Sequence, residues 1–370
     1  MKILLVAGAR PNFMKIAPLV RALTARRPGP CHGEFSWKIV HTGQHYDYEM
    51  SQAFFEDLEL PRPDFFLNAG SGSHASQTAR IMTAFEEVCL AERPDLVVVV
   101  GDVNSTLACS ITAKKLLIRV AHVEAGLRSF DMAMPEEINR MVTDSISDFL
   151  FVTEESAVRN LLREGKPRES IHFVGHVMID NLFHQLGRLE REDPARLSTY
   201  PLKKELHRYV FLTLHRPSNV DSPETFSGIV DALNEIAAET PILFPVHPRT
   251  RKMMGEFGVR LHPGVRLLDP LGFTESLFLW KDAAVVITDS GGLQEETTAL
   301  GVPCITVREN TERPITVEMG TNTVAGNRKE AILRAYRDLG TKTPAKRRVP
   351  PLWDGMAAER IVDILLRAPR

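Results

Sequence analysis

The sequence contains little of what several common classes of protein require. Only 4 of its 370 residues are cysteine, they lie far apart, and no two form a Cys-x-x-Cys pair. A disulfide framework or a zinc knuckle is therefore not indicated, and a reducing cytoplasm is the expected compartment. No apolar run approaches the roughly 18 residues of a membrane span. The formal net charge of -2 lacks the basic excess of nucleic-acid binding proteins, so we expect neither a membrane nor nucleic acid as a partner.

The length and composition are those of an ordinary globular protein. With 370 residues, 44% hydrophobic and 25% charged, the chain can bury two cores of usual domain size. Its first apolar run, residues 3–7, stops before Gly8 and Pro11, which is typical of a short buried strand rather than of a signal peptide.

A short apolar run followed by an amphipathic stretch recurs along most of the chain. The run at 96–100 is Leu-Val-Val-Val-Val, so both faces of this strand are expected to be buried under helices, as in a parallel sheet. Phe226, Ile229 and Leu233 recur at helical spacing after a Ser-Pro start at 222–223. This alternation predicts doubly wound parallel sheets. The predicted strands are 2–7, 38–42, 95–101, 119–123, 149–152 and 172–174, then 209–214, 242–246, 265–268, 284–288 and 304–307.

The two series of strands predict two domains. Charge and proline interrupt the pattern between 185 and 207, and a second irregular stretch at 340–351 precedes a final amphipathic helix. We therefore expect an α/β chain with an N-terminal domain over 1–185, completed by a helix over 353–370, and a C-terminal domain over 186–352. Because ligands of open α/β sheets bind at the carboxyl ends of the strands, polar residues at those ends are the candidates for a site.

Two cationic side chains follow the first strand. In residues 8–15, Gly-Ala-Arg-Pro-Asn-Phe-Met-Lys, the start of a helix supplies N–H groups, and Arg10 and Lys15 supply the charge to hold an anion. The loop is not Gly-x-Gly-x-x-Gly, so it does not favour a dinucleotide fold. The alternative is a turn with two solvated cations.

Carboxylates gather after the next strands. Asp102 follows the fully apolar strand, although an acid there is also an ordinary helix cap. Glu124 ends a strand within His-Val-Glu-Ala-Gly-Leu-Arg (122–128), and Glu136 opens a helix within Met-Pro-Glu-Glu-Ile-Asn-Arg (134–140). Acid–base chemistry needs several carboxylates around one carbon. Acids at a helix start are also common without any function. The same is true of an acid that pairs on the surface with an arginine four residues later.

The second series carries its own polar residues. His215 and Arg216 end its first strand, where a histidine could contact a phosphate or donate a proton, although a lone histidine is more often structural. The glycines of Asp-Ser-Gly-Gly-Leu-Gln-Glu-Glu (289–296) let a helix start approach a diphosphate, and a carboxylate further along would accept from ribose hydroxyls. The alternative is a glycine turn with a capping serine. Phe273 is a candidate for an apolar wall beside a base, or for core packing.

Together these segments resemble the non-hydrolysing UDP-N-acetylglucosamine 2-epimerases. The most specific part is His-Val-Glu-Ala-Gly-Leu-Arg followed by Pro-Glu-Glu-Ile-Asn-Arg, whereas Asp-Ser-Gly-Gly alone is similar in many glycosyltransferases. The resemblance runs in order over nearly the whole chain. Its segments are 8–15, 42–50, 101–106, 122–129, 134–140, 214–219, 247–249, 289–296 and 308–314.

The resemblance implies two Rossmann-like domains facing a central cleft, the GT-B arrangement, with UDP held mainly by the C-terminal half. It implies an isomerase that makes UDP-N-acetylmannosamine for cell-surface polysaccharide, through anti elimination of UDP to a 2-acetamidoglucal and re-addition. This chemistry needs no nicotinamide, no other cofactor and no metal. A homodimer is expected from the resemblance alone.

Carried over by motif position, the resemblance also implies roles for individual residues. Catalytic roles fall to Asp102, Glu124, Glu136 and His215. We favour the two glutamates for proton transfer and Asp102 for electrostatic stabilisation of a cationic centre. The implied substrate-binding residues are Arg10, Lys15, Arg128, Arg140, His247, Phe273, Ser290, Gly291, Gly292, Glu296 and Arg313.

The sequence departs from the family pattern in two regions that, in the family, help to bind a second UDP-N-acetylglucosamine as an activator. Asp47 stands where many bacterial members have glutamine, and Pro-Ser follows His215 and Arg216 in place of their usual sequence. We therefore expect any activation to take a different form. The candidate allosteric region comprises Gln44, His45, Asp47 and Arg216.

Four other functions stay open from the sequence. The nearest is the same C2 reaction on a modified sugar, such as a UDP-2,3-diacetamido-hexuronic acid, which a cationic pocket for the C6 carboxylate would favour. A GT-B glycosyltransferase would bind an acceptor, and a hydrolysing epimerase would release free N-acetylmannosamine. A non-catalytic sensor of nucleotide sugars would have no need of Asp102, Glu124, Glu136 and His215 together.

Overall fold

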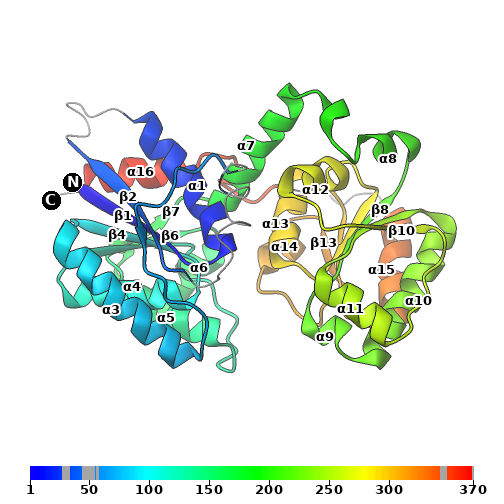
Figure 1. Ribbon diagram of the computed structural model, residues 1–370, viewed down its shortest axis with the longest axis horizontal. Helices are drawn as coiled ribbons and strands as arrows, with labels where there is room; N and C mark the ends of the chain where they lie inside the picture. The colour runs from blue at the N-terminus through cyan, green and yellow to red at the C-terminus, as the bar shows by residue number, and fades with distance from the viewer. Residues whose placement is uncertain (27–33, 44–54, 56–57, 342–347, 369–370) are drawn as a thin grey trace. The chain divides into compact units, whose positions relative to one another are not determined.

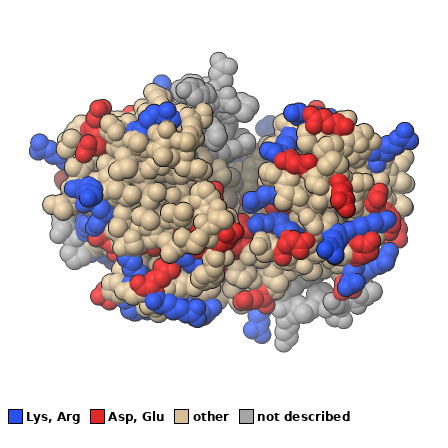
Figure 2. Space-filling model, turned by 90° about the horizontal axis from the view of Figure 1, so that it is seen from below, with Lys and Arg blue, Asp and Glu red and all other residues tan. Residues whose placement is uncertain are grey.

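The chain divides into two compact α/β units, Met1–Asn181 with Pro351–Arg370 and Leu182–Pro350 (Figure 1). The boundaries predicted from the sequence are 185 and 352. None of the helices in the described part of the chain is long and apolar enough to cross a membrane. Cationic and anionic side chains are interspersed on the face that Figure 2 shows. The computed structural model describes residues 1–26, 34–43, 55, 58–341 and 348–368.

The first unit is built on a seven-stranded parallel sheet with the order β3-β2-β1-β4-β5-β6-β7. Every residue of the central strand β4 is buried, and alternate residues enter two separate cores. Because alternate side chains of a strand point to opposite faces, helices on both faces explain its unbroken apolar run. The strands are β1 (Lys2–Ala7), β2 (Ser36–His41), β3 (Phe65–Phe66), β4 (Leu96–Val100), β5 (Arg119–Val123), β6 (Phe149–Val152) and β7 (Ile171–Phe173).

The C-terminal helix α16 packs beside α1 in this first unit, although the two are far apart in sequence (Figure 1). Asp180 accepts hydrogen bonds from the first two N–H groups of α16, at 3.1 and 2.6 Å. The indole of Trp353 donates to the carbonyl oxygen of Thr153. The helical segments are α1 (Arg10–Ala25), α3 (His74–Glu92), α4 (Asn104–Lys115), α5 (Pro135–Ile146), α6 (Glu155–Arg163), η1 (Arg168–Ser170), α7 (Val177–Arg191), which continues into the second unit, and α16 (Ala357–Arg367).

The second unit is built on a six-stranded parallel sheet with the order β10-β9-β8-β11-β12-β13. Its strands are β8 (Val210–Thr213), β9 (Ile242–Pro245), β10 (Val265–Leu268), β11 (Val285–Thr288), β12 (Cys304–Thr306) and β13 (Asn322–Val324). Its helical segments are η2 (Pro194–Arg196), α8 (Tyr200–Glu205), α9 (Pro217–Val220), α10 (Pro223–Glu239), α11 (Pro248–Glu256), α12 (Phe273–Trp280), α13 (Gly291–Leu300), α14 (Pro314–Glu318) and α15 (Lys329–Thr341).

The predicted parallel α/β architecture is confirmed, and each of the eleven predicted strands has its counterpart within two residues at either end. Helix α10 begins as predicted, because Ser222 accepts from the N–H of Thr225 and the apolar stripe from Phe226 onward is buried. Two edge strands were missed. β3 has only two residues and β13 is Asn-Thr-Val, so neither contains an apolar run long enough to predict a strand.

Candidate active site

The candidate site of the first unit lies at the carboxyl ends of β1, β4 and β5. Gly101, directly after β4, has φ of 65°, a left-handed conformation that glycine adopts readily. A Cβ atom at this position would lie 2.8 Å from Lys15 Nζ and 3.7 Å from Glu124 Oε2. The ammonium and the carboxylate therefore meet over the glycine, and any side chain there would displace them.

Lys15 and Glu124 form a buried ion pair. Lys15 is 9% exposed and Glu124 only 4%, so bulk water solvates neither charge. Glu124 also has φ of 73°, which is strained for a residue with a side chain. The N–H groups of Glu124 and Ala125 hold this conformation, because both donate to the carbonyl oxygen of Phe151 at 3.0 Å. A strained, buried carboxylate paired with a lysine is typical of a functional group.

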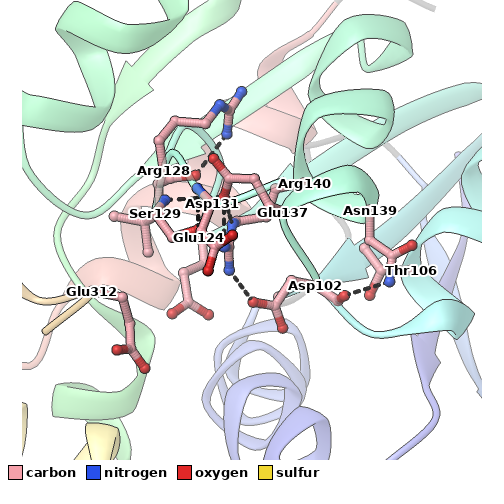
Figure 3. Close-up of polar contacts among 12 residues, drawn as sticks. Asp102, Thr106, Glu124, Arg128, Ser129, Asp131, Glu137, Asn139, Arg140 and Glu312 are labelled. Carbon is pink, nitrogen blue, oxygen red and sulfur yellow. Dashed lines mark hydrogen bonds and ion pairs between the residues drawn. The ribbon is translucent and has the colours of Figure 1, made fainter. Parts of the chain in front are cut away.

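Helix α5 anchors Asp102 from two successive residues (Figure 3). Arg140 Nη1 donates to Asp102 Oδ2 at 2.5 Å, and the side-chain amide of Asn139 donates to the Asp102 carbonyl oxygen at 2.8 Å. The Asp102 side chain is nevertheless 32% exposed. It is therefore fixed in position and still accessible to a ligand.

Glu137 belongs to the same cluster, although it is not among the site residues predicted from the sequence. Arg140 donates to Glu137 Oε2 from both Nε and Nη2, at 3.0 and 2.6 Å. The N–H groups of Ser129 and Phe130 donate to the two carboxylate oxygens. Burial alone would raise the pKa of Glu137, but these hydrogen bonds and the charge of Arg140 bring it below its ordinary value. The available signal was the three-residue spacing from Arg140.

The pair of Glu136 with Arg140, considered in the sequence analysis as an ordinary surface pair, does not form. Arg140 is turned toward Glu137 and Asp102 instead (Figure 3). Glu136 is half-buried and makes no hydrogen bond or ion pair within the part of the chain that the structure describes. Its carboxylate is consequently available, whereas that of Glu137 holds the loop before α5.

Arg128 is committed to two carboxylates of its own unit. Its Nη2 lies 2.7 Å from both Asp144 Oδ2 and Glu164 Oε2, and its side chain is 1% exposed. The arginine thus fastens the loop after β5 to α5 and to the end of α6. This arrangement favours a structural role, and its predicted contact with substrate stays a prediction.

In the second unit, Asp289 organises the loop that follows β8. Its carboxylate accepts from the N–H groups of His215 and Arg216 and from the amide of Asn219, at 2.9, 2.8 and 3.2 Å. His215 Nδ1 lies 2.8 Å from its other oxygen. Burial alone would raise the pKa of Asp289, but the hydrogen bond and charge of His215 hold it below its ordinary value. Because Nδ1 is occupied, the half-exposed imidazole has Nε2 left for another contact.

Ser290, Gly291 and Gly292 begin helix α13. No side-chain hydrogen bond caps the helix at Ser290, so the alternative of a capping serine is not observed. A Cβ atom on Gly292 would meet nothing within 4 Å, and one on Gly291 would meet only Glu312 Oε1 at 3.3 Å. The first turn of α13 therefore offers its N–H groups with open space in front of Gly292, which suits an anion.

One turn along α13 lies a carboxyl group that is neutral near pH 7. Burial, and next the charge of Glu295, raise the pKa of Glu296 to about 8. A neutral carboxyl can both donate and accept hydrogen bonds. Glu295 itself is paired with Arg313, whose Nε lies 2.7 Å away. The predicted cationic loop is thus fastened to α13 next to Glu296.

Two further predicted contacts lie at helix starts of the second unit. The rings of His247 and His215 have their centroids 5.8 Å apart, so the two histidines share one region. Burial, and next the charge of His215, lower the pKa of His247. Phe273 is the first residue of α12 and is half-buried, which is compatible with either of its predicted roles.

The candidate allosteric residues are described only in part. Arg216 Nη2 lies 3.7 Å from Glu312 Oε1, within the second unit. The predicted substrate contact Arg10 begins α1, and its side chain is likewise not among those described. Gln44, His45 and Asp47 lie outside the described residues.

Comparison with known proteins gives matches over nearly the whole chain. The sequence model of a family described as UDP-N-acetylglucosamine 2-epimerase matches residues 31–366. A UDP-N-acetylglucosamine 2-epimerase of Methanocaldococcus jannaschii is 43% identical over 99% of both chains. Its crystal structure with UDP-N-acetylglucosamine and UDP superposes with a TM-score of 0.86, at 42% identity and full coverage of both chains. A UDP-2,3-diacetamido-2,3-dideoxy-D-glucuronate 2-epimerase of Pseudomonas aeruginosa is 41% identical over 93% of both chains.

Proposed function

The chain belongs to the UDP-N-acetylglucosamine 2-epimerase family, and we propose that it inverts C2 of UDP-N-acetylglucosamine to give UDP-N-acetylmannosamine without hydrolysing the sugar. The observation that carries the proposal is that Lys15 of α1 and Glu124, which follows β5, meet over Gly101, next to Asp102 after β4. An epimerisation at carbon needs one group to remove a proton and another to return it. Several fixed carboxylates at one sheet edge supply such groups.

The proposed reaction begins with loss of UDP. As the C1–O bond breaks, positive charge develops at C1, and the proton on C2 becomes acidic. A carboxylate removes that proton, and the electron pair of the C2–H bond forms the C1=C2 double bond of the glycal. Re-addition of UDP at C1 with protonation of C2 on the opposite face gives the epimer. Asp102, anchored by Arg140 and partly exposed, suits stabilisation of the cationic centre.

Glu124 and Glu136 are the proposed proton-transfer groups. Glu124 is held beside Gly101 by its ion pair with Lys15. Glu136 makes no hydrogen bond or ion pair with a described residue, so its carboxylate is available to a substrate. Lys15, Arg10, Arg128 and Arg140 stay proposed substrate contacts of this unit, the last also through its hold on Asp102.

The second unit is proposed to hold UDP. The open first turn of α13 at Ser290, Gly291 and Gly292 suits the diphosphate, and His215 can reach it with Nε2. Glu296, one turn further along α13, is the proposed partner of the ribose hydroxyls. Further proposed contacts of this unit are His247, Phe273 and Arg313.

Exchange at C2 tests this function directly. Purified protein is mixed with UDP-N-acetylglucosamine in D₂O, without added metal or nicotinamide, and followed by NMR. We expect deuterium at C2 of both UDP-sugars and the appearance of UDP-N-acetylmannosamine. Accumulation of free N-acetylmannosamine with UDP would instead show a hydrolysing enzyme. Bound nucleotide sugar with no exchange would contradict the proposal.

A modified UDP-sugar is the second candidate substrate, favoured by the 41% identity to the glucuronate 2-epimerase of Pseudomonas aeruginosa. The groups proposed for C2 chemistry and for UDP serve either substrate, because both carry the same UDP and the same reacting carbon. The same exchange experiment with UDP-2,3-diacetamido-2,3-dideoxy-D-glucuronate separates them. The substrate with the larger kcat/KM is the better one.

We also propose a homodimer in a reducing compartment such as the cytoplasm. Phe130, Met132, Ile138 and Met141 are exposed apolar side chains in and just before α5, which a second copy would cover. Cys89, Cys109 and Cys304 are buried and free, as in a protein not exposed to oxidising conditions. Light scattering should give a mass near twice 41.4 kDa, whereas a single-chain mass would contradict the dimer.

A further inference from the structure

His122 lies next to the catalytic carboxylates and takes no part in the reaction proposed above. It is a residue of β5, two positions before Glu124, and it is completely buried. Its Nδ1 lies 2.6 Å from Asp144 Oδ1 on α5, and its Nε2 lies 2.8 Å from the carbonyl oxygen of Gly101. Both ring nitrogens are therefore engaged, one with a helix and one with the end of β4.

The contact with Gly101 requires Nε2 of His122 to be the donor. A peptide carbonyl oxygen can only accept a hydrogen bond, and the same is true of an ionised carboxylate. Asp144 is ionised: the N–H of Gly126 and the guanidinium of Arg128 donate to its other oxygen at 3.0 and 2.7 Å. Burial alone would raise the pKa of Asp144, but the charges and hydrogen bonds of His122 and Arg128 lower it. His122 thus donates from Nε2 to the Gly101 carbonyl oxygen, and its Nδ1 faces the Asp144 carboxylate.

His122 ends a chain of polar side chains whose other members alternate in charge. Glu164 binds Arg128, Arg128 binds Asp144, and Asp144 binds His122. The side chains of the last three residues are exposed by 1% or less, so each buried charge is balanced by its neighbour. At the inner end of the chain lies a neutral group, the Gly101 carbonyl. A histidine that only filled space in the core would not require this arrangement.

We propose that His122 is a positioning residue, which holds the Gly101–Asp102 peptide and thereby fixes Asp102 for the reaction. A peptide unit is planar, so fixing its oxygen sets the direction in which the chain enters Asp102. The hydrogen bond from His122 is needed because residue 101 is glycine, whose backbone is otherwise free to rotate. Arg140 fixes the carboxylate end of Asp102. The inference rests on the proposed function only for the role of Asp102 in the reaction.

The peptide itself provides the first readout. Gly101–Asp102 is the only Gly-Asp sequence in the chain. Protein labelled with [1-¹³C]glycine and [¹⁵N]aspartate therefore gives a single ¹³C-coupled amide signal, that of this peptide. In His122→Gln the amide nitrogen lies as many bonds from Cβ as Nε2 and still reaches the Gly101 oxygen. In His122→Asn the amide nitrogen lies as many bonds from Cβ as Nδ1, so it reaches only toward Asp144. We expect the asparagine variant to shift the signal and the glutamine variant to leave it near its wild-type position.

The matched control is His172→Asn. His172 lies on β7 in the same sheet, is half-buried, and has ring contacts with Phe149 and Phe151. The variant removes a partly buried histidine from β7, which is not a neighbour of β4 in the sheet and so lies away from Gly101. Both the peptide signal and the rate of C2 exchange should stay at their wild-type values.

The reaction provides the second readout. His122→Asn should lower kcat for C2 exchange about 100-fold, the cost of a misplacement of roughly 1 Å, with KM little changed. His122→Gln should recover most of that loss. A merely structural role would destabilise both variants and leave kcat of the folded fraction alike. If wild-type protein exchanges C2 of no UDP-sugar, the proposed function fails, and the peptide signal still decides the role of His122.

Equal shifts of the peptide signal in the two variants, or no shift in either, would overturn the proposal. A further measurement requires no variant and so applies even if the substitutions prevent folding. In wild-type protein labelled with [¹⁵N]histidine, Nε2 of His122 should carry a proton, because the Gly101 carbonyl oxygen can only accept. A bare Nε2 would equally overturn the proposal.

Discussion

Replacement of Glu124 by glutamine is expected to lower kcat for C2 exchange by about 100-fold or more, the usual contribution of a general acid or base. Glutamine preserves the size of the side chain and can still accept a hydrogen bond from Lys15, but it cannot take up the C2 proton. Deuterium incorporation at C2 of UDP-N-acetylglucosamine, followed by NMR, measures the effect. Binding of the nucleotide should change little, because the proposed UDP contacts lie in the second unit.

Glu155→Gln is the control for this substitution. Glu155 begins α6 in the same unit, its side chain is 73% exposed, and it lies 3.8 Å from Arg159 in a surface pair. Exchange by this variant should equal that of the wild type. If Glu124→Gln also exchanged at the wild-type rate, Glu124 would not be the base, and Glu136 would be the next residue to replace.

Asp289→Ala is expected to destabilise the second unit by about 3–5 kcal/mol, the cost of removing one partner from a buried charged network. The variant leaves the N–H groups of His215 and Arg216 and the amide of Asn219 without their acceptor. It also releases the imidazole of His215, so nucleotide binding should weaken as well. Native-state hydrogen exchange of amides in β8 and β11 measures the stability of this unit separately from the first.

The loss of stability in Asp289→Ala should depend on pH in a direction that the pKa of Asp289 sets. The folded state holds the pKa of Asp289 below its ordinary value of 3.8, so its stabilisation is present above that value. It is lost as the pH falls through the lower folded pKa, and the difference between wild type and variant should shrink there. Asp221→Ala is the control, because Asp221 forms an exposed pair with Arg249 and should matter little. Equal losses in both variants would show that Asp289 is not a structural centre of the loop.

The apolar pattern was sufficient to predict the parallel sheets because burial on both faces leaves a local mark. The run at 96–100 could be read without a structure, since every residue of it had to be apolar. Edge strands leave no such mark: β13 is Asn-Thr-Val and is a strand because it hydrogen-bonds to β12. Pairing of this kind depends on a neighbour that is distant in sequence.

The candidate site divides in the same way. Asp102, Glu124 and His215 were predicted because each follows an apolar strand, and strand ends are local features of the sequence. Glu137 was missed because its three-residue spacing from Arg140 is no stronger a signal than the four-residue spacing of Glu136 beside it. Only the direction of each side chain on α5 decides which one Arg140 binds.

The sequence by itself determined the fold class, the family resemblance and the positions of the polar strand ends, because each of these is recorded in periodicity or in contiguous motifs. The tertiary structure decided which charges meet. Lys15 and Glu124 are more than a hundred positions apart, and His122 on β5 contacts Gly101 at the end of the neighbouring strand β4. Those contacts are set by the parallel register of β1, β4 and β5, which brings distant strand ends to one edge of the sheet.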